Sequence, residues 1–378
     1  MLFRSDSVKG RIILLRANIT TLRPADIAYS KRLSDKELAK MPDTYMFERP
    51  MIEMFLEELK AQYAATQFLK TKGALALLMM DPKGRDGTVF ADGTPSFDPR
   101  YPASMPQVMV SSEDFLKMQR LVQGGAELKI DLDIATKWHT DDLKGYNVIA
   151  EIPGTDPELK DQVVMLGGHL DSWHSGTGAT DNAAGCAVMM EAVRLISVLG
   201  LKPKRTIRIA LWGAEEQGLL GSFGYVKKHF GDPATMKLLP EHKKISAYFN
   251  LDNGTGKIRG IFLQNNEEAR SIFTSWLQPY ADLDANTITS ANTGSTDHLS
   301  FDALGIPGFQ FIQDPLEYLT RTHHSNMDTY DHLQVEDLKQ AATIVAGFIY
   351  NAAMRKDMLP RKKSPRAGRF LFDTDFPL

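Results

Sequence analysis

The second part of the chain repeats one pattern: a short run of apolar residues followed by a longer stretch with apolar residues at helical spacing. Near-continuous apolar runs are typical of strands that are buried on both faces, and the longer stretches predict amphipathic helices. The predicted strands are 146–154, 161–169, 204–213, 243–254, 258–264 and 306–314. The predicted helices are 181–200, 219–230, 266–281 and 334–356. This alternation predicts an α/β sheet with helices on both faces.

Residues 1–138 show a different and less regular pattern. The predicted strands are 10–17, 74–80, 106–110 and 126–134, the last with strict alternation of apolar and polar residues. The predicted helices are 48–73 and 111–125, the second with a serine cap and a glycine stop. A polar connector at 136–145 follows. We therefore divide the chain into a first domain at 1–138, a second at 139–357 and a tail at 358–378.

Composition excludes several classes of protein. The chain has 378 residues, 43% of them hydrophobic and 24% charged, which is ordinary for a globular protein. A net charge of −3 gives no field that recruits nucleic acid. No apolar run reaches the roughly 18 residues of a membrane span. The single cysteine, Cys186, excludes an internal disulfide and thiolate metal clusters, and its small apolar neighbours indicate a packing role.

Imidazoles and carboxylates follow four of the predicted strands in the second domain. They are His169, Asp171 and Asp181 after the first of these strands, Glu215 and Glu216 after the second, Asp252 after the third, and His323, His324 and Asp328 after the fourth. Each group alone is typical of a solvated turn. Ligands of open α/β sheets, however, bind at the carboxyl ends of the strands, so we expect these side chains to converge.

The convergence of so many carboxylates predicts bound cations. Asp181, Glu215, Glu216 and Asp252 would repel one another strongly in a buried site unless protons or metal ions neutralised them. Imidazole and carboxylate ligands suit Zn²⁺, and a carboxylate can bridge two ions about 3.5–4 Å apart. Three carboxylates, two neutral histidines and two dications leave one positive charge, which a bridging hydroxide cancels. One glutamate of the adjacent pair then remains as a base, because neighbours in an extended segment point in opposite directions.

The motifs in the second domain resemble those of a known family. GGHLDSW, TGATDNAAG, WGAEEQGLLGS, NLDNG, GSTDHLSF and THHSNMDTYD are similar, in this order, to the di-zinc exopeptidases of the aminopeptidase and carboxypeptidase Q type. HLDSW and THHSNMDT are most similar to the carboxypeptidase Q-like branch. The resemblance spans about residues 145–355 and implies two Zn²⁺ per chain.

The resemblance implies a role for each candidate residue. His169 and Asp252 would bind one zinc, Glu216 and His324 would bind the other, and Asp181 would bridge the two ions. His324 is preferred to His323 because the family's ligand lies four residues before the Asp of a D-T pair, here Asp328. Glu215 matches the general base, and Asp171 matches the carboxylate that orients the histidine ligand.

The resemblance also implies the architecture of the whole chain. It implies a mixed, mostly parallel sheet of the zinc-exopeptidase type, together with a smaller α+β protease-associated domain in 1–138. Segment 19–72 would then be an inserted helical segment, serving as a lid or as an interface. The first ten residues lack the apolar run of a signal peptide. The family resemblance implies a secreted or periplasmic protein if the N-terminus is truncated, and family members often form homodimers, although no dimer surface is readable in the pattern.

The predicted function is hydrolysis of peptide bonds in short peptides or dipeptides. Arg321 is a candidate for binding a substrate carboxylate, or it forms a surface salt bridge. Asp297 and His298 are candidates for holding an amine or the developing oxyanion, or they are structural. The alternatives are an aminopeptidase of the same family, a hydrolase of non-peptide amides, and a non-catalytic, receptor-like member.

Overall fold

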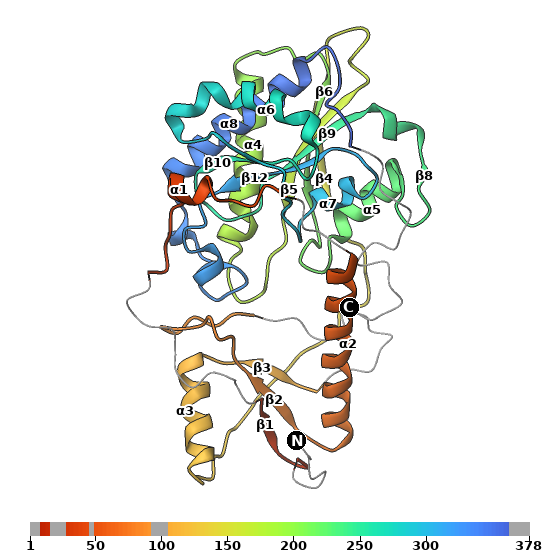
Figure 1. Ribbon diagram of the computed structural model, residues 1–378. Coiled ribbons are helices and arrows are strands. Elements are labelled where there is room, and N and C mark those ends of the chain that lie inside the picture. The colour runs from red at the N-terminus through yellow and green to blue at the C-terminus, as the bar shows by residue number, and fades with distance from the viewer. Residues whose placement is uncertain (1–7, 16–27, 45–48, 92–104, 363–378) are drawn as a thin grey trace.

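A seven-stranded sheet forms the centre of the second domain (Figure 1). The computed structural model describes residues 8–15, 28–44, 49–91 and 105–362. The strand order is β11-β10-β12-β9-β5-β6-β4. The strands are β4 (Val148–Ile152), β5 (Val163–His169), β6 (Thr206–Trp212), β9 (Ile245–Asn250), β10 (Ile258–Phe262), β11 (Thr287–Thr289) and β12 (Gly308–Gln313). Only β10–β12 and β4–β6 pair antiparallel, which confirms a mixed, mostly parallel sheet.

Helices cover both faces of this sheet, as predicted. On β5, Val164 and Leu166 pack in the core that includes α4 (Ala184–Val198), α6 (Arg270–Leu277) and α8 (Val335–Met354). Val163 and Met165 point to the other face and pack in a second core with α5 (Leu220–His229) and the residues after α7 (His298–Asp302). Since each fully buried aliphatic side chain contributes about 1.5–3 kcal/mol, burial of alternate residues on both faces holds the central strands in place.

The start of α4 differs from the sequence prediction. A π-helical turn, Ala179–Ala183, precedes the helix, and Asp181 in that turn has the non-helical angles φ −131° and ψ 85°. The helix itself begins at Ala184. The prediction that Asp181 begins the helix is therefore wrong, and the Asp181 side chain is placed by the turn.

The first part of the chain contains a separate three-stranded sheet. It consists of β1 (Ile12–Leu14), β2 (Ala76–Met79) and β3 (Gln107–Met109), and all neighbouring pairs are parallel. The helices are α1 (Asp35–Leu38), α2 (Arg49–Thr71) and α3 (Ser112–Gln123). The predicted start of α3 is confirmed, because the Ser111 hydroxyl accepts a hydrogen bond from the N–H of Asp114.

All neighbouring strands of the small sheet are parallel, and the expected α+β protease-associated domain stays a prediction. One expectation for this part is wrong. Residues 126–134 have no strand structure, and Leu132 and Ile134 are exposed because no described strand lies beside them. The domain boundaries stay predictions. Parts of the 19–72 segment, at 19–27 and 45–48, and residues 363–378 of the tail lie outside the described residues.

Some short elements have no counterpart in the predicted set. They include α1, β11, α7 and the two-residue pair β7 (Gly231–Asp232) and β8 (Lys237–Leu238). Within the described residues, every helix falls short of the length and hydropathy needed to cross a bilayer.

Two segments of the first part reach the large-sheet domain. Residues 28–44, which include α1, run beside that domain in Figure 1, and Lys31 forms a β-bridge with Leu316. Residues 81–91 follow β2, and Phe90 forms a second bridge with Ser325. The second bridge lies next to the candidate ligand His324, so the first part of the chain borders the candidate site.

Candidate metal centre

The carboxyl ends of the strands bring the predicted ligands together. His169 is the last residue of β5, and Asp252 lies two residues beyond β9. Glu216 lies four residues beyond β6, and His324 follows the π-helical turn (Tyr318–Thr322) after β12. The parallel strands therefore deliver these side chains to one edge of the sheet, as the sequence predicts.

Asp181 lies between two histidines. Its Oδ1 is 3.3 Å from Nε2 of His169, and its Oδ2 is 3.3 Å from Nε2 of His324. His169 Nε2 is also 3.2 Å from Asp252 Oδ1, and His324 Nε2 is 3.0 Å from Glu216 Oε2. The two groups of side chains thus share one carboxylate, with a separate oxygen facing each group.

These distances fit metal ions. Ligand atoms about 2.0–2.1 Å from a tetrahedral zinc lie about 3.3 Å from one another, and the four distances above are 3.0–3.3 Å. Asp181 Oδ2 and Glu216 Oε1 are buried and have no hydrogen-bond partner among the described residues. Buried carboxylate oxygens without donors are costly unless a cation is bound, so the donor set suits two metal ions.

Asp171 holds several parts of the site in position. Its Oδ1 accepts a hydrogen bond of 3.0 Å from the N–H of Glu215, and its Oδ2 accepts one of 3.1 Å from the N–H of Glu216. The Nδ1 atom of His169 is 2.9 Å from the Asp171 carbonyl oxygen. Burial alone would raise the pKa of the Asp171 carboxyl, but His169 and the two N–H groups hold it below its usual value.

Asp328 performs a similar task for Asp181. Its carboxylate accepts hydrogen bonds from the N–H of Thr180 at 2.6 Å and from the N–H of Asp181 at 3.2 Å. The sequence predicts Asp328 at this edge of the sheet, but the only use made of it there is the choice between His323 and His324. The D-T pair that contains Asp328 is the sequence feature that could indicate this role. A buried carboxylate in a loop needs hydrogen-bond donors, here two backbone N–H groups.

Glu215 is buried beside the candidate ligands. Burial raises the pKa of its carboxyl well above the usual value, and Asp252, Asp297 and Glu216 add to the rise by charge repulsion, against the lowering effect of His169. The Glu215–Glu216 pair lies in a turn that begins after Ala214 at φ +56°. The expectation that an extended segment separates these two side chains is therefore wrong.

His323 also lies near the site. Its ring stacks on His324, with 3.6 Å between the ring centroids, and its Nε2 is 3.9 Å from Asp181 Oδ2. Burial, the neighbouring His324 and the Lys83 ammonium lower the pKa of the His323 imidazole to about 4. His324 is the closer of the two to Asp181 and also contacts Glu216, so we keep it as the preferred ligand.

The three predicted substrate residues lie in different surroundings. Asp297 and His298 are fully buried at the start of α7. Burial raises the pKa of Asp297 to about 7 and lowers the pKa of His298 to about 3. The Arg321 guanidinium lies 4.8 Å from the centre of the Tyr29 ring, and its Nε is 4.0 Å from Glu317 Oε2. The charges of His169 and Asp252 therefore act on the Asp297 carboxyl. Arg321 instead packs on the 28–44 segment.

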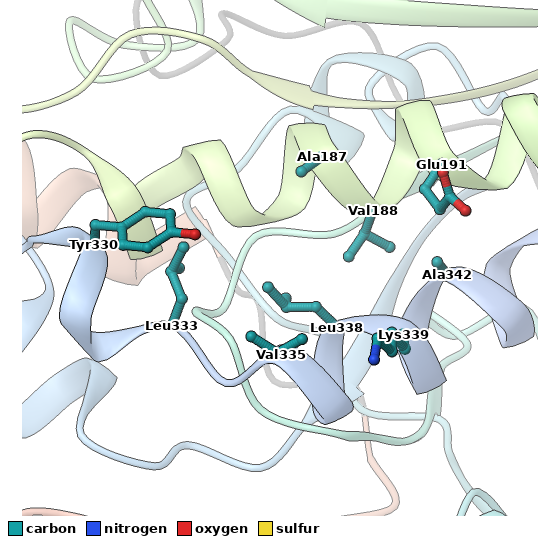
Figure 2. Close-up of a pocket in the computed structure, with 9 residues that line it drawn as sticks. All are labelled: Ala187, Val188, Glu191, Tyr330, Leu333, Val335, Leu338, Lys339 and Ala342. Atoms are coloured by element: carbon teal, nitrogen blue, oxygen red, sulfur yellow. The ribbon is translucent and has the colours of Figure 1, made fainter.

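A mainly apolar pocket lies between α4 and α8 (Figure 2). Val188 of α4 and Leu338 of α8 line it, and Tyr330 stands at one end. Glu191 at its rim is paired with Arg194. None of the predicted site residues lines this pocket, so we do not place the substrate there.

Comparison with known proteins agrees with this geometry. The profile of Peptidase family M28 matches residues 147–349. Human carboxypeptidase Q is 32% identical over 272 residues, which cover 72% of this chain and 53% of that protein. The aminopeptidase YwaD of Bacillus subtilis is 30% identical over 213 residues, covering 54% of this chain and 44% of that protein.

A solved structure shares the fold. The Peptidase M28 precursor from Shewanella amazonensis superposes with a TM-score of 0.64 at 24% identity, covering 96% of this chain and 72% of that one. This chain spans about half the length of the carboxypeptidase Q relatives that it matches. The family profile covers more than half of the chain and includes every candidate ligand. The chain therefore belongs to peptidase family M28, a family of zinc metallopeptidases.

Proposed function

We propose that this chain is a two-zinc exopeptidase that hydrolyses short peptides or dipeptides, as a carboxypeptidase Q-like enzyme. The observation that carries the proposal is Asp181, whose two oxygens face the His169 and His324 groups at 3.3 Å each. His169, Asp181 and Asp252 would hold one ion, and Asp181, Glu216 and His324 the other. The 32% identity to human carboxypeptidase Q supports this branch of the family.

Glu215 is the proposed general base. When bound, the two ions supply Lewis acidity and make water in the site more acidic. Glu215 accepts a proton from the attacking water on a carboxylate oxygen and then returns it to the nitrogen of the leaving amine. The raised pKa of its buried carboxyl suits both transfers, because a base with a pKa nearer neutrality also serves as an acid. Asp171 fixes the turn that carries Glu215 through its two backbone hydrogen bonds.

An aminopeptidase is the second candidate. The 30% identity to the aminopeptidase YwaD supports it, over a shorter part of the chain. A non-catalytic, receptor-like protein is disfavoured because suitable residues occupy all the proposed ligand positions and the base position.

The test uses zinc-loaded protein and one dipeptide in three forms: unblocked, N-acylated and C-amidated. Hydrolysis that requires the free carboxylate supports the carboxypeptidase Q-like activity. Hydrolysis that requires the free amine supports the aminopeptidase. If no form is cleaved above the rate of a Glu215→Gln control, the proposed function is wrong.

A further inference from the structure

A loop of the first part of the chain, residues 81–91, is fixed against the segment that carries the candidate histidines. The N–H of Ala91 donates to the carbonyl of His324 at 2.6 Å, and the N–H of Asn326 donates to the carbonyl of Val89 at 3.0 Å. The Asn326 side chain accepts from the N–H of Val89 at 2.8 Å and donates to the carbonyl of Gly87 at 3.2 Å. Four hydrogen bonds thus place this loop next to a proposed zinc ligand.

The Lys83 ammonium packs on Phe90, a residue of the same loop. Its Nζ lies 4.3 Å from the centre of the Phe90 ring, and Phe90 is only 3% exposed. The carboxylate of Asp81 accepts from the N–H of Lys83 at 2.7 Å, which fixes the start of the loop. The Lys83 ammonium is 3.6 Å from Asp81 Oδ2, and 49% of the side chain is exposed. The ammonium is therefore positioned by a buried ring and remains accessible to a ligand.

The position of Lys83 matters because of the charges around the proposed zinc ions. With two zinc ions and a bridging hydroxide the proposed ligands are neutral in sum, but the carboxylates of Glu215, Asp171 and Asp328 lie around them, so a peptide that presents a free carboxylate needs a cation nearby. The Lys83 ammonium lies over the Phe90 ring, and Phe90 forms a β-bridge with Ser325, the residue next to His324. Arg321, the cation expected from the sequence, instead packs on the Tyr29 ring.

We propose that Lys83 binds the C-terminal carboxylate of the substrate and so determines specificity for peptides with a free C-terminus. This inference rests on the proposed exopeptidase function and adds to it one residue, contributed by the first part of the chain. Lys83 is a specificity residue, which binds the end of the peptide and takes no part in proton transfer.

The experiment measures binding in a background without turnover. Zinc-loaded Glu215→Gln protein is titrated by calorimetry with an unblocked dipeptide and with its C-amidated form. The same pair of titrations is repeated after adding Lys83→Met, Lys83→Arg, Arg321→Met or Lys72→Met. Lys72 is a matched control, because its ammonium also lies over a phenylalanine ring, 5.5 Å from the centre of Phe68, on another part of the chain.

We expect C-amidation to weaken binding roughly tenfold in the Glu215→Gln background, as loss of a charge-assisted hydrogen bond does. The difference between the two peptides should disappear in Lys83→Met. It should persist in Lys83→Arg, Arg321→Met and Lys72→Met.

Three results would overturn the inference: the same ratio of affinities with and without Lys83, loss of the ratio in Arg321→Met but not in Lys83→Met, or no binding of either peptide. Turnover by the wild-type chain is measured separately. If the Glu215→Gln protein binds the two peptides with the expected ratio but the wild type hydrolyses none of them, the proposed function fails and the assignment of Lys83 stands.

Discussion

Asp171 connects the proposed base to a proposed ligand through hydrogen bonds. It accepts from the N–H groups of Glu215 and Glu216, and its carbonyl oxygen meets His169. Asp171→Asn replaces one accepting oxygen by an amide donor that faces a backbone N–H. We expect zinc affinity to fall about 10–100-fold, as for other residues that orient metal ligands. Competition with a chromogenic chelator measures this loss, and unchanged affinity would contradict the role of Asp171.

Glu215 is expected to affect turnover without affecting metal binding. Glu215→Gln keeps the shape and size of the side chain but removes its ability to accept the proton. We expect the rate to fall about 10²–10⁴-fold, the usual contribution of general acid–base catalysis. Metal analysis of the same preparation should find as much zinc as in the wild type. An active Glu215→Gln protein would remove Glu215 from the mechanism.

At the residue scale, the sequence predicts which candidate ligands converge better than it predicts their surroundings. His169, Asp181, Glu216, Asp252 and His324 can be chosen because each follows an apolar run and matches a motif. Lys83 cannot be found in this way, because it lies in a turn-rich loop far away in the chain and has no periodic context. Only the folded chain shows that this loop lies beside His324.

The α7 helix carries a histidine that makes stability depend on pH. Burial lowers the pKa of His298 to about 3, against an ordinary value of about 6.5. Between these values the unfolded chain binds a proton that the folded chain does not, so stability falls as the pH decreases below about 6.5. At about 1.4 kcal/mol per pH unit, the loss at pH 4.5 is about 2–3 kcal/mol.

The measurement is urea unfolding of the metal-free protein at pH 7.5 and pH 4.5, compared with the same pair for His298→Gln. The variant should lose less stability than the wild type over this interval. An equal loss in the two proteins would show that His298 takes up its proton in the folded state.

At the element scale, the sequence predicts the long elements of the second domain and misses the short ones. The central strands are nearly continuous apolar runs, which is the pattern that burial on both faces requires. β11 and α7 have three and five residues, too few to show a period. Residues 126–134 have the alternation of a strand, but alternation cannot provide the neighbouring strand that pairing needs.

Residues 28–44 attach the first part of the chain to the large-sheet domain through a buried carboxylate. Asp314 is fully buried and accepts hydrogen bonds from Arg32 Nη1 at 3.1 Å, the N–H of Leu33 at 2.9 Å and Arg259 Nη1 at 2.9 Å. Asp314→Ala leaves the largely buried guanidinium of Arg259 without this partner. We expect unfolding free energy to fall by about 3–5 kcal/mol, as when one member of a buried ion pair is removed.

Lys31→Ala is the control for this prediction. The Lys31–Glu37 ion pair lies in the same segment, but both side chains are largely exposed, so its loss should cost at most about 1 kcal/mol. Urea unfolding of both variants tests the difference. Equal effects would mean that the Asp314 cluster does not hold the segment in place.

At the scale of the whole molecule, the contacts that complete the site join residues far apart in the chain. Leu33 meets Asp314 and Phe90 meets Ser325, whereas sequence patterns describe only neighbours within one element. The fold class of the second domain could therefore be predicted, but the approach of the first part of the chain to the candidate metal centre could not.

The central claim is that Asp181 is a ligand of two metal ions and that this chain needs both ions to act as a peptidase. The most direct test adds zinc stepwise to the metal-free wild-type chain and follows both bound zinc and hydrolysis of an unblocked dipeptide. We predict no hydrolysis without metal and full hydrolysis once two zinc ions are bound per chain. Hydrolysis by the metal-free chain at the full rate, or binding of two zinc ions with no hydrolysis of any of the three peptide forms, would contradict it.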